Sequence, residues 1–267
     1  MTGIHPQRPP TDDPGASESG ASRDRGASEV VSFIITFSII TTMIGLLYTG
    51  GSVSMMKIQT SNQIQNAESV FMAMDDSFGE LQEGQAPKRA GSLDLDVGAS
   101  LAVIDESEVE VTVNGPGFSQ TLQTRSLEYR LEDRSIAYET GAIFRTNDGA
   151  SAMIASPSGI FCSPSSNGSV VSIVTLVAPN GSSVASGTAT VTGIQRSTTL
   201  LYPADRTGGT AVENVTIDVT SPRESAWQQY FEEAEGWTDE DGDGTYACES
   251  ADEVFVRQTV IEVQIQN

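Results

Sequence analysis

The sequence predicts an α+β protein. A long N-terminal transmembrane helix continues into an amphipathic helix, and a mainly antiparallel, β-sandwich-like domain with one short late helix follows. Three observations carry this prediction: an uncharged apolar run at 30–48, a proline-free stretch with helical periodicity after it, and many short segments of alternating polarity beyond residue 92. The predicted boundaries are a disordered leader at 1–26, a transmembrane helix at 27–49, an amphipathic helix at 50–86 and a β-rich domain at 87–267.

The apolar run, Val30–Tyr48, has 19 residues and no charge. At a rise of about 1.5 Å per residue it is long enough to cross a hydrocarbon core of about 30 Å. A secretory signal has a shorter apolar region and a small-residue cleavage site after it, so we expect this run to stay in the mature protein and to contact membrane lipid. Ser38, Thr42, Gly45 and Thr49 share one face of the helix. They either let another helix approach or bond to carbonyls of their own helix.

The stretch 52–83 contains no proline and is rich in Gln, Met, Ala and Glu. Its apolar residues recur at alternating spacings of three and four, which indicates one stripe along a helix. The stripe consists of Ile64, Ala67, Phe71, Met74, Phe78 and Leu81. Gly84 and Pro87 are expected to end this helix, and Gly50-Gly51 to bend it. Two interpretations remain open, because the stripe suits either the protein's own β domain or a helix of another subunit.

Short segments with a period of two dominate the chain from Ser92 onward, and this alternation is typical of strands. The predicted strands are 93–97, 109–113, 117–123, 126–131, 134–138, 142–146, 150–155, 169–177, 189–194, 198–202, 215–219 and 255–265. Ser169–Val177 is the most apolar of them, so it is expected in the interior of a sheet. Ser225–Ala234 predicts a helix whose Trp227, Tyr230 and Phe231 lie on one face and pack against the sheet.

Acidic residues outnumber basic ones, 36 to 14, and the formal charge is −22. The acids are spread along the whole chain rather than gathered in one tail. A spread acidic surface binds hydrated cations and keeps a protein soluble in strong salt, so we interpret it as the signature of a halophile. The same charge argues against nucleic acid as a partner, because phosphates need basic contacts.

The basic residues nearest the apolar run predict its orientation. Arg23 and Arg25 precede the run, and Lys57 is the first basic residue after it. The positive-inside rule then places the N-terminus in the cytoplasm and the C-terminal domain outside the cell. Three glycosylation triplets agree with an extracellular domain, at Asn167, Asn180 and Asn214. The leader is rich in Pro, Ser, Gly and Asp and lacks the apolar residues that a core requires, so we expect it to be disordered.

Two cysteines follow the apolar run, Cys162 and Cys248. An extracellular location permits them to form one disulfide, and the alternative is a pair of separate buried thiols. Two cysteines are too few for a structural zinc site of their own. The single histidine is His5 in the leader, so the common catalytic triads and metal centres lack their histidine.

One loop has the composition of a calcium site. Asp239, Asp241 and Asp243 precede Gly244 in the pattern that opens a calcium-binding loop. The twelfth position is Ser250 instead of the usual glutamate, so the alternative is a solvated acidic turn. Calcium is the one cofactor that the sequence suggests, and the prediction otherwise is that the protein has none.

No enzyme motif stands out in the sequence. The nucleophile elbow, the zinc-protease helix motif, the phosphate-binding loop and the dinucleotide fingerprint are all missing from it. Carboxylates are abundant, but nothing in the sequence selects one pair for acid–base catalysis. We therefore predict a protein that is not an enzyme and has no catalytic residues.

The segment Arg25-Gly26-Ala27-Ser28-Glu29 followed by the apolar run resembles archaeal type IV pilin-like proteins. That resemblance implies cleavage by a prepilin peptidase between Gly26 and Ala27, and assembly with pilin-like subunits through the N-terminal helix. Glu29 would then be third in the mature chain, whereas the bacterial pattern has its glutamate fifth. The segments 27–48, 129–144 and 227–231 are also similar to an uncharacterised family of haloarchaeal membrane-anchored proteins. The structural alternative is a plain single-pass anchor that does not assemble.

The sequence therefore supports two functions. The first is a structural, pilin-like protein of the cell surface, anchored in the cell membrane by a single pass. The second is a monomeric anchored binding module, whose extracellular domain presents an acidic, calcium-binding surface.

Overall fold

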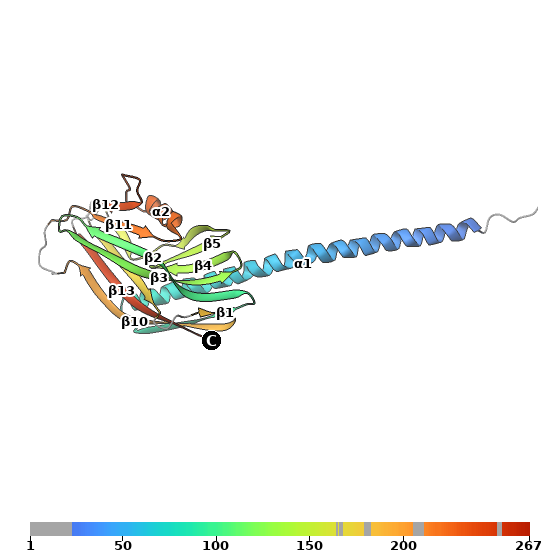
Figure 1. Ribbon diagram of the computed structural model, residues 1–267, viewed down its shortest axis with the longest axis horizontal. Helices are drawn as coiled ribbons and strands as arrows, with labels where there is room; N and C mark the ends of the chain where they lie inside the picture. The colour runs from blue at the N-terminus through green and yellow to red at the C-terminus, as the bar shows by residue number, and fades with distance from the viewer. Residues whose placement is uncertain (1–22, 164, 166–167, 179–182, 205–210, 250–252) are drawn as a thin grey trace, which may run out of the picture. The chain divides into compact units, whose positions relative to one another are not determined.

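The computed structural model describes residues 23–163, 165, 168–178, 183–204, 211–249 and 253–267. It divides into two compact units. The first ends at Ile58, and the second begins at Gln59. The helix α1 (Arg23–Gln82) contributes to both units. Its second half therefore belongs to the same compact unit as the strands that follow (Figure 1). The predicted leader lies outside the described residues, apart from Arg23–Gly26, which are helical.

The helix α1 runs through Gly50 and Gly51 without interruption, so the predicted bend at these glycines is wrong. It ends at Gln82 rather than at residue 86. The N–H of Gly84 bonds to the carbonyl of Leu81 at 3.1 Å, and the φ angle of Gly84 is +74°. Glycine adopts this left-handed conformation at low cost, which is why it commonly closes helices. The predicted stop at Gly84 is thus confirmed, with a boundary four residues earlier than drawn from the sequence.

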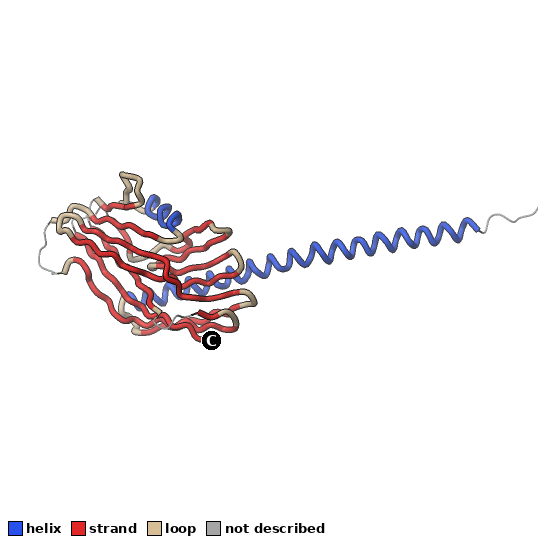
Figure 2. The backbone as a smooth tube through the Cα atoms, in the orientation of Figure 1, coloured by secondary structure: helices blue, strands red, loops and turns tan. Residues whose placement is uncertain are grey.

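Two sheets follow α1, and together with the late helix they make an α+β fold (Figure 2). The first sheet has five strands in the order β1 (Lys88–Leu95), β10 (Gly187–Tyr202), β13 (Glu253–Gln266), β8 (Gly168–Val177) and β7 (Ile160–Ser163). The second has eight, with the path β12 (Thr245–Cys248), β11 (Val215–Thr220), β2 (Ala99–Val113), β3 (Phe118–Leu131), β4 (Arg134–Glu139), β5 (Ala142–Asn147) and β6 (Ala150–Ala155), and with β9 (Ser183–Val184) paired to β2.

The strand pairs are antiparallel except for β8 and β13, which run parallel. The mainly antiparallel arrangement is as predicted, and β8 is an interior strand, as its apolar composition indicated. Two pairs of predicted strands prove to be single long strands. The first pair forms β3, and the second forms β10, which continues through a register shift between Gln195 and Ser197. The short strands β7, β9 and β12 had no alternating pattern long enough to predict them.

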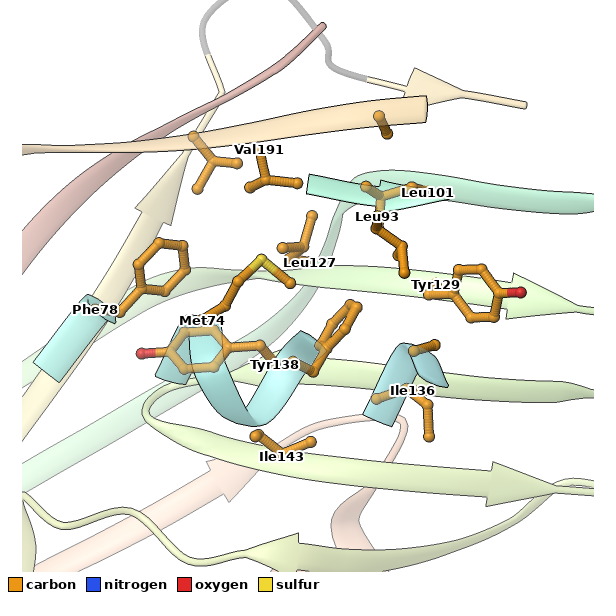
Figure 3. Close-up of a cluster of buried hydrophobic side chains, with 14 of the residues drawn as sticks. Met74, Phe78, Leu93, Leu101, Leu127, Tyr129, Ile136, Tyr138, Ile143 and Val191 are labelled. Carbon is orange, nitrogen blue, oxygen red and sulfur yellow. The ribbon is translucent and has the colours of Figure 1, made fainter. Parts of the chain in front are cut away.

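The stripe on α1 is buried in the protein's own core. All six of its residues are at most 4% exposed, and they pack with apolar side chains from both sheets. Figure 3 shows Met74 and Phe78 of α1 among side chains such as Tyr138 of β4 and Val191 of β10. The rings of Phe78 and Tyr138 meet edge to face, with centroids 5.1 Å apart. The first interpretation of the stripe is confirmed, and these six residues are not available to another subunit.

A second core lies around the late helix α2 (Glu224–Glu233), whose existence was predicted within one residue at each end. Its Trp227 and Phe231 are each 1% exposed and pack against residues of β5, β11 and β12. Phe231 stacks on Tyr246 with centroids 4.7 Å apart. Tyr230 is half-buried and donates its hydroxyl to the carbonyl of Ile160 at 2.8 Å. The predicted packing of this aromatic face on the sheet is therefore confirmed.

Gly193 of β10 lies too close to α1 to accept a side chain without displacing the core. A Cβ placed there would lie 2.5 Å from Cε1 of Phe78 and 3.1 Å from Cδ1 of Leu81. We expect Gly193→Ala to lower the free energy of unfolding by about 1–3 kcal/mol, because overpacking forces core side chains from their places. Gly79→Ala is the matched control, since a Cβ there meets nothing within 4 Å. It should instead stabilise the helix by about 0.5–1 kcal/mol. Denaturant unfolding of both variants measures the difference, and equal effects would contradict it.

Candidate functional site

The helix α1 carries an apolar surface that nothing in the described structure covers. Residues Glu29–Tyr48 form a helical stretch of 20 residues that is long and apolar enough to cross a membrane. Its large side chains are exposed, among them Phe33, Phe37 and Leu47. The hydroxyl of Thr42 donates to the carbonyl of Ser38 at 2.7 Å. The hydroxyl of Thr42 therefore has its hydrogen bond within its own helix, which agrees with the second interpretation of the small-residue face.

Cys162 and Cys248 are joined in a disulfide, with their Cα atoms 5.8 Å apart. This distance meets the geometric condition for a bridge, which fails beyond about 7 Å. Cys162 lies on β7 and Cys248 on β12, so the bond ties an end strand of one sheet to an end strand of the other. The residues are 86 apart in the sequence. In the chain-entropy model, closing so long a loop lowers the conformational entropy of the unfolded chain and stabilises the fold by about 4.6 kcal/mol.

The acidic loop turns its carboxylates toward its own backbone. Asp239 accepts the N–H groups of Gly242 at 2.7 Å and Gly244 at 3.0 Å, and Asp243 accepts that of Thr245 at 2.9 Å. Asp241 makes no such bond in the described structure and is exposed. Among the described residues, no three His, Cys, Asp or Glu side chains gather as a metal ion would require. Calcium binding at this loop stays a prediction.

The remaining predicted positions are described only in part. Asn167 and Asn180 lie outside the described residues, and Gly26 and Ala27 are known only as helical backbone within α1. Asn214 is half-buried beside Asn114, whose amide donates to it at 2.6 Å. Its own amide nitrogen lies 3.2 Å from both carboxylate oxygens of Glu249. A glycan on that nitrogen would have to displace the contact with Glu249.

A buried ionic cluster joins α2 to the second sheet. The guanidinium of Arg223, a residue that is 3% exposed, donates to Glu139 at 2.8 Å and pairs with Glu128. Trp227 donates its indole N–H to the other oxygen of Glu139 at 3.0 Å, and Glu139 is completely buried. Arg130 also donates to Glu128 at 2.8 Å. The sequence analysis missed this cluster. Its one signal was the presence of glutamates inside the apolar stretches that became β3 and β4.

A cavity of about 260 Å³ lies beside the last turns of α1, and its lining is oxygen-rich. Its lining includes carboxylates of α1 and four residues with hydroxyl groups, Tyr138, Thr140, Ser158 and Ser172. Burial, and then the charge of Asp76, raise the pKa of Asp75 from 3.8 to about 6. Burial and the nearby Asp75 likewise raise the pKa of Tyr138. The sequence analysis did not single out these residues, because their approach depends on how α1 packs against β4.

Comparison with known proteins places the chain within one family. A family model matches residues 25–266, and it is described as a family of unknown function (DUF7289). No curated protein matches the chain. No solved structure matches it either.

Arg223 should be essential to the stability of the fold. Arg223→Met would leave the carboxylates of Glu128 and Glu139 buried without their shared cation, which typically costs about 3–5 kcal/mol. Arg196→Met is the matched control, because the side chain of Arg196, which pairs with Glu262, is 50% exposed, against 4% for that of Arg223. Surface pairs contribute little. Denaturant unfolding should show a large loss for the first variant and a small one for the second. Equal losses would contradict a specific role for the cluster.

The raised pKa of Asp75 predicts a pH-dependent stability. The folded protein holds this proton more tightly than the unfolded chain does. The resulting contribution to the free energy of unfolding is therefore complete below pH 3.8 and is lost as the pH rises through about 6. Asp75→Asn removes this ionisation. The melting temperature of the variant minus that of the wild type should therefore increase as the pH rises from 4 to 7. Asp241→Asn in the exposed loop controls for the loss of one negative charge. A gain that is the same at every pH would disprove the assignment.

Proposed function

We propose that this chain, which belongs to the DUF7289 family, is a structural, non-enzymatic protein of the cell surface. Its N-terminal helix would span the membrane once, and its β-sandwich-like domain would be extracellular. The observation that carries the proposal is the apolar, exposed stretch Glu29–Tyr48 of α1. Exposing this much apolar surface to water is unfavourable, whereas a bilayer accommodates it at little cost.

Two independent features support the proposed orientation. Arg23 and Arg25 precede the apolar stretch, and such residues favour the cytoplasmic side. The disulfide between Cys162 and Cys248 lies in the unit after the stretch. Disulfides persist in oxidising surroundings, which the outside of the cell supplies and the cytosol does not. Both features support an extracellular C-terminal unit.

The pilin-like part of the proposal rests on the segment around Gly26 and Ala27 and on the helix that follows it. Cleavage there would leave the apolar helix at the new N-terminus, free to pack with pilin-like subunits in the membrane. The buried stripe on the second half of α1 is occupied by the protein's own sheets. Assembly would therefore use residues before that stripe. In a halophilic archaeon, the acidic surface would keep the exposed unit soluble.

The second candidate function is a monomeric anchored binding module. The oxygen-lined cavity beside α1 favours this function. More carboxylates than basic side chains line the cavity, so it would attract a positively charged ligand. The two candidates share the membrane anchor and the extracellular location. They differ in processing, since a plain anchor needs no cleavage after Gly26.

One experiment on intact cells tests both the topology and the processing. Cells are treated with an external protease, and the peptides that are released and retained are identified by mass spectrometry. We expect peptides from residues 59–267 to be released and the apolar stretch to be retained. The retained fragment should begin at Ala27, because the peptidase would have removed the leader.

Lysed cells provide the control, since there the protease reaches both sides of the membrane. Protection of the C-terminal unit in intact cells would disprove the extracellular location. A retained fragment that includes residues before Gly26 would favour the plain anchor over the pilin-like protein.

A further inference from the structure

We propose that the cavity beside the last turns of α1 binds a short aliphatic chain that carries two ammonium groups. This inference goes beyond the structural role proposed above and does not depend on membrane anchoring. The cavity has a volume of about 260 Å³ and is formed within the C-terminal unit. Its walls come from α1, from the turn between β4 and β5, from the segment before β7 and from β8.

The α1 wall carries negative charge that the described structure does not neutralise. Asp75, Asp76, Glu80 and Glu83 all line the cavity. Glu80 pairs with Arg89, and Glu83 accepts a hydrogen bond from the neutral side chain of Gln85. Neither Asp75 nor Asp76 has an ion pair or hydrogen bond among the described residues. Three carboxylates therefore lack a cation, and a positively charged ligand would supply it.

The wall formed by the end of β4 and the turn after it holds a buried hydroxyl that has no hydrogen-bond partner in the described structure. Thr140 lines the cavity and is 1% exposed, and its Oγ1 makes no hydrogen bond in the described structure. Leaving such a group unsatisfied typically costs about 1–3 kcal/mol. Thr140 also has a φ angle of 54°, which is uncommon for a β-branched residue. Tyr138 brings a second hydroxyl to the same wall. An ammonium group donates up to three hydrogen bonds, so it can serve Thr140 and a carboxylate together.

Gly79 leaves room for the ligand along the helix. A glycine inside a helix costs about 1 kcal/mol relative to alanine. Packing does not require it here, because a Cβ at Gly79 would meet nothing within 4 Å. Asp76, Gly79 and Glu83 follow at spacings of three and four. Glu83 is the first residue after α1, and its N–H still bonds to the carbonyl of Gly79 at 2.9 Å, so the three share one face. The helical rise separates Asp76 from Glu83 by about 10 Å along the axis. Between them Gly79 presents bare backbone, and Glu80 lies on the same face, where it pairs with Arg89.

The separation of the charges selects the chemistry of the ligand. A bare metal ion needs several oxygen ligands around one point. The described residues contain no group of three acidic, His or Cys side chains placed in this way. A chain with an ammonium group at each end instead puts one charge beside Asp75 and Asp76 and the other beside Glu83. Its methylene groups would lie over Gly79.

The test is calorimetric titration of the full chain, in an uncharged detergent at constant ionic strength, with putrescine as the probe. We expect saturable binding of one putrescine per chain. Butylamine, which has one ammonium group, should bind at least tenfold more weakly. Magnesium at the same concentration should not displace putrescine. Displacement by magnesium would overturn the ammonium chemistry in favour of a hydrated metal ion.

Three variants locate the binding. Asp75→Asn should weaken putrescine at least tenfold, because it removes a carboxylate that would hold one ammonium group. Gly79→Leu should do the same, because its side chain fills the cavity. Thr140→Val, which replaces the hydroxyl by a methyl group, should weaken binding several-fold. The matched control is Asp241→Asn, which removes the same charge from an exposed loop outside the cavity. It should change the affinity less than twofold.

The outcomes that would overturn the proposal are equally definite. An equal loss for Asp75→Asn and Asp241→Asn would mean that putrescine is attracted by the net charge alone. Unchanged binding to Gly79→Leu would place the ligand elsewhere, and unchanged binding to Thr140→Val would remove the hydroxyl from the site. Absence of saturable binding to the wild type would end the proposal. Thermal unfolding of each variant verifies that it is folded before its affinity is compared.

Discussion

The close packing of the second half of α1 against the two sheets is the contact on which the fold depends. Six apolar residues of this helix supply one face of the main core, and both sheets contribute the rest. The absence of a side chain at Gly193 lets β10 approach α1 closely, because any side chain there would collide with Phe78. A helix that merely preceded the β-rich part would leave this core open to water. Residues 59–82 are therefore an integral part of the C-terminal unit.

Two further links hold the end of the unit that α2 covers. The disulfide joins β7 to β12, which are end strands of different sheets. The buried cluster of Arg223 with Glu128 and Glu139 joins α2 to β3 and β4, and Trp227 completes it through its indole N–H. These links act differently from the apolar core. The disulfide limits the unfolded chain, whereas the ionic cluster is favourable only while every charge keeps its partner.

One helix carries three kinds of surface along its length. From Glu29 to Tyr48 it is apolar on all sides and exposed, which suits lipid. From Ile64 to Leu81 it is apolar along one stripe, which suits the sheets. The side of α1 that carries Asp75 and Glu80 lines the cavity instead. A candidate membrane anchor, a core element and a candidate binding surface thus share one continuous helix. The same arrangement is compatible with a structural protein that also recognises a small cation.

Patterns that depend on neighbours along the chain could be predicted without the structure. The apolar run, the stripe from Ile64 to Leu81, the stop at Gly84 and the aromatic face of α2 all follow from helical spacing, so they were found. Three features of the sheets were not predicted. They are the union of segments into β3 and β10, the parallel pairing of β8 with β13, and the short strand β7. The cavity and the cluster around Arg223 also required the structure. Their residues lie far apart in the sequence, and each looks like an ordinary surface charge until packing removes the water around it.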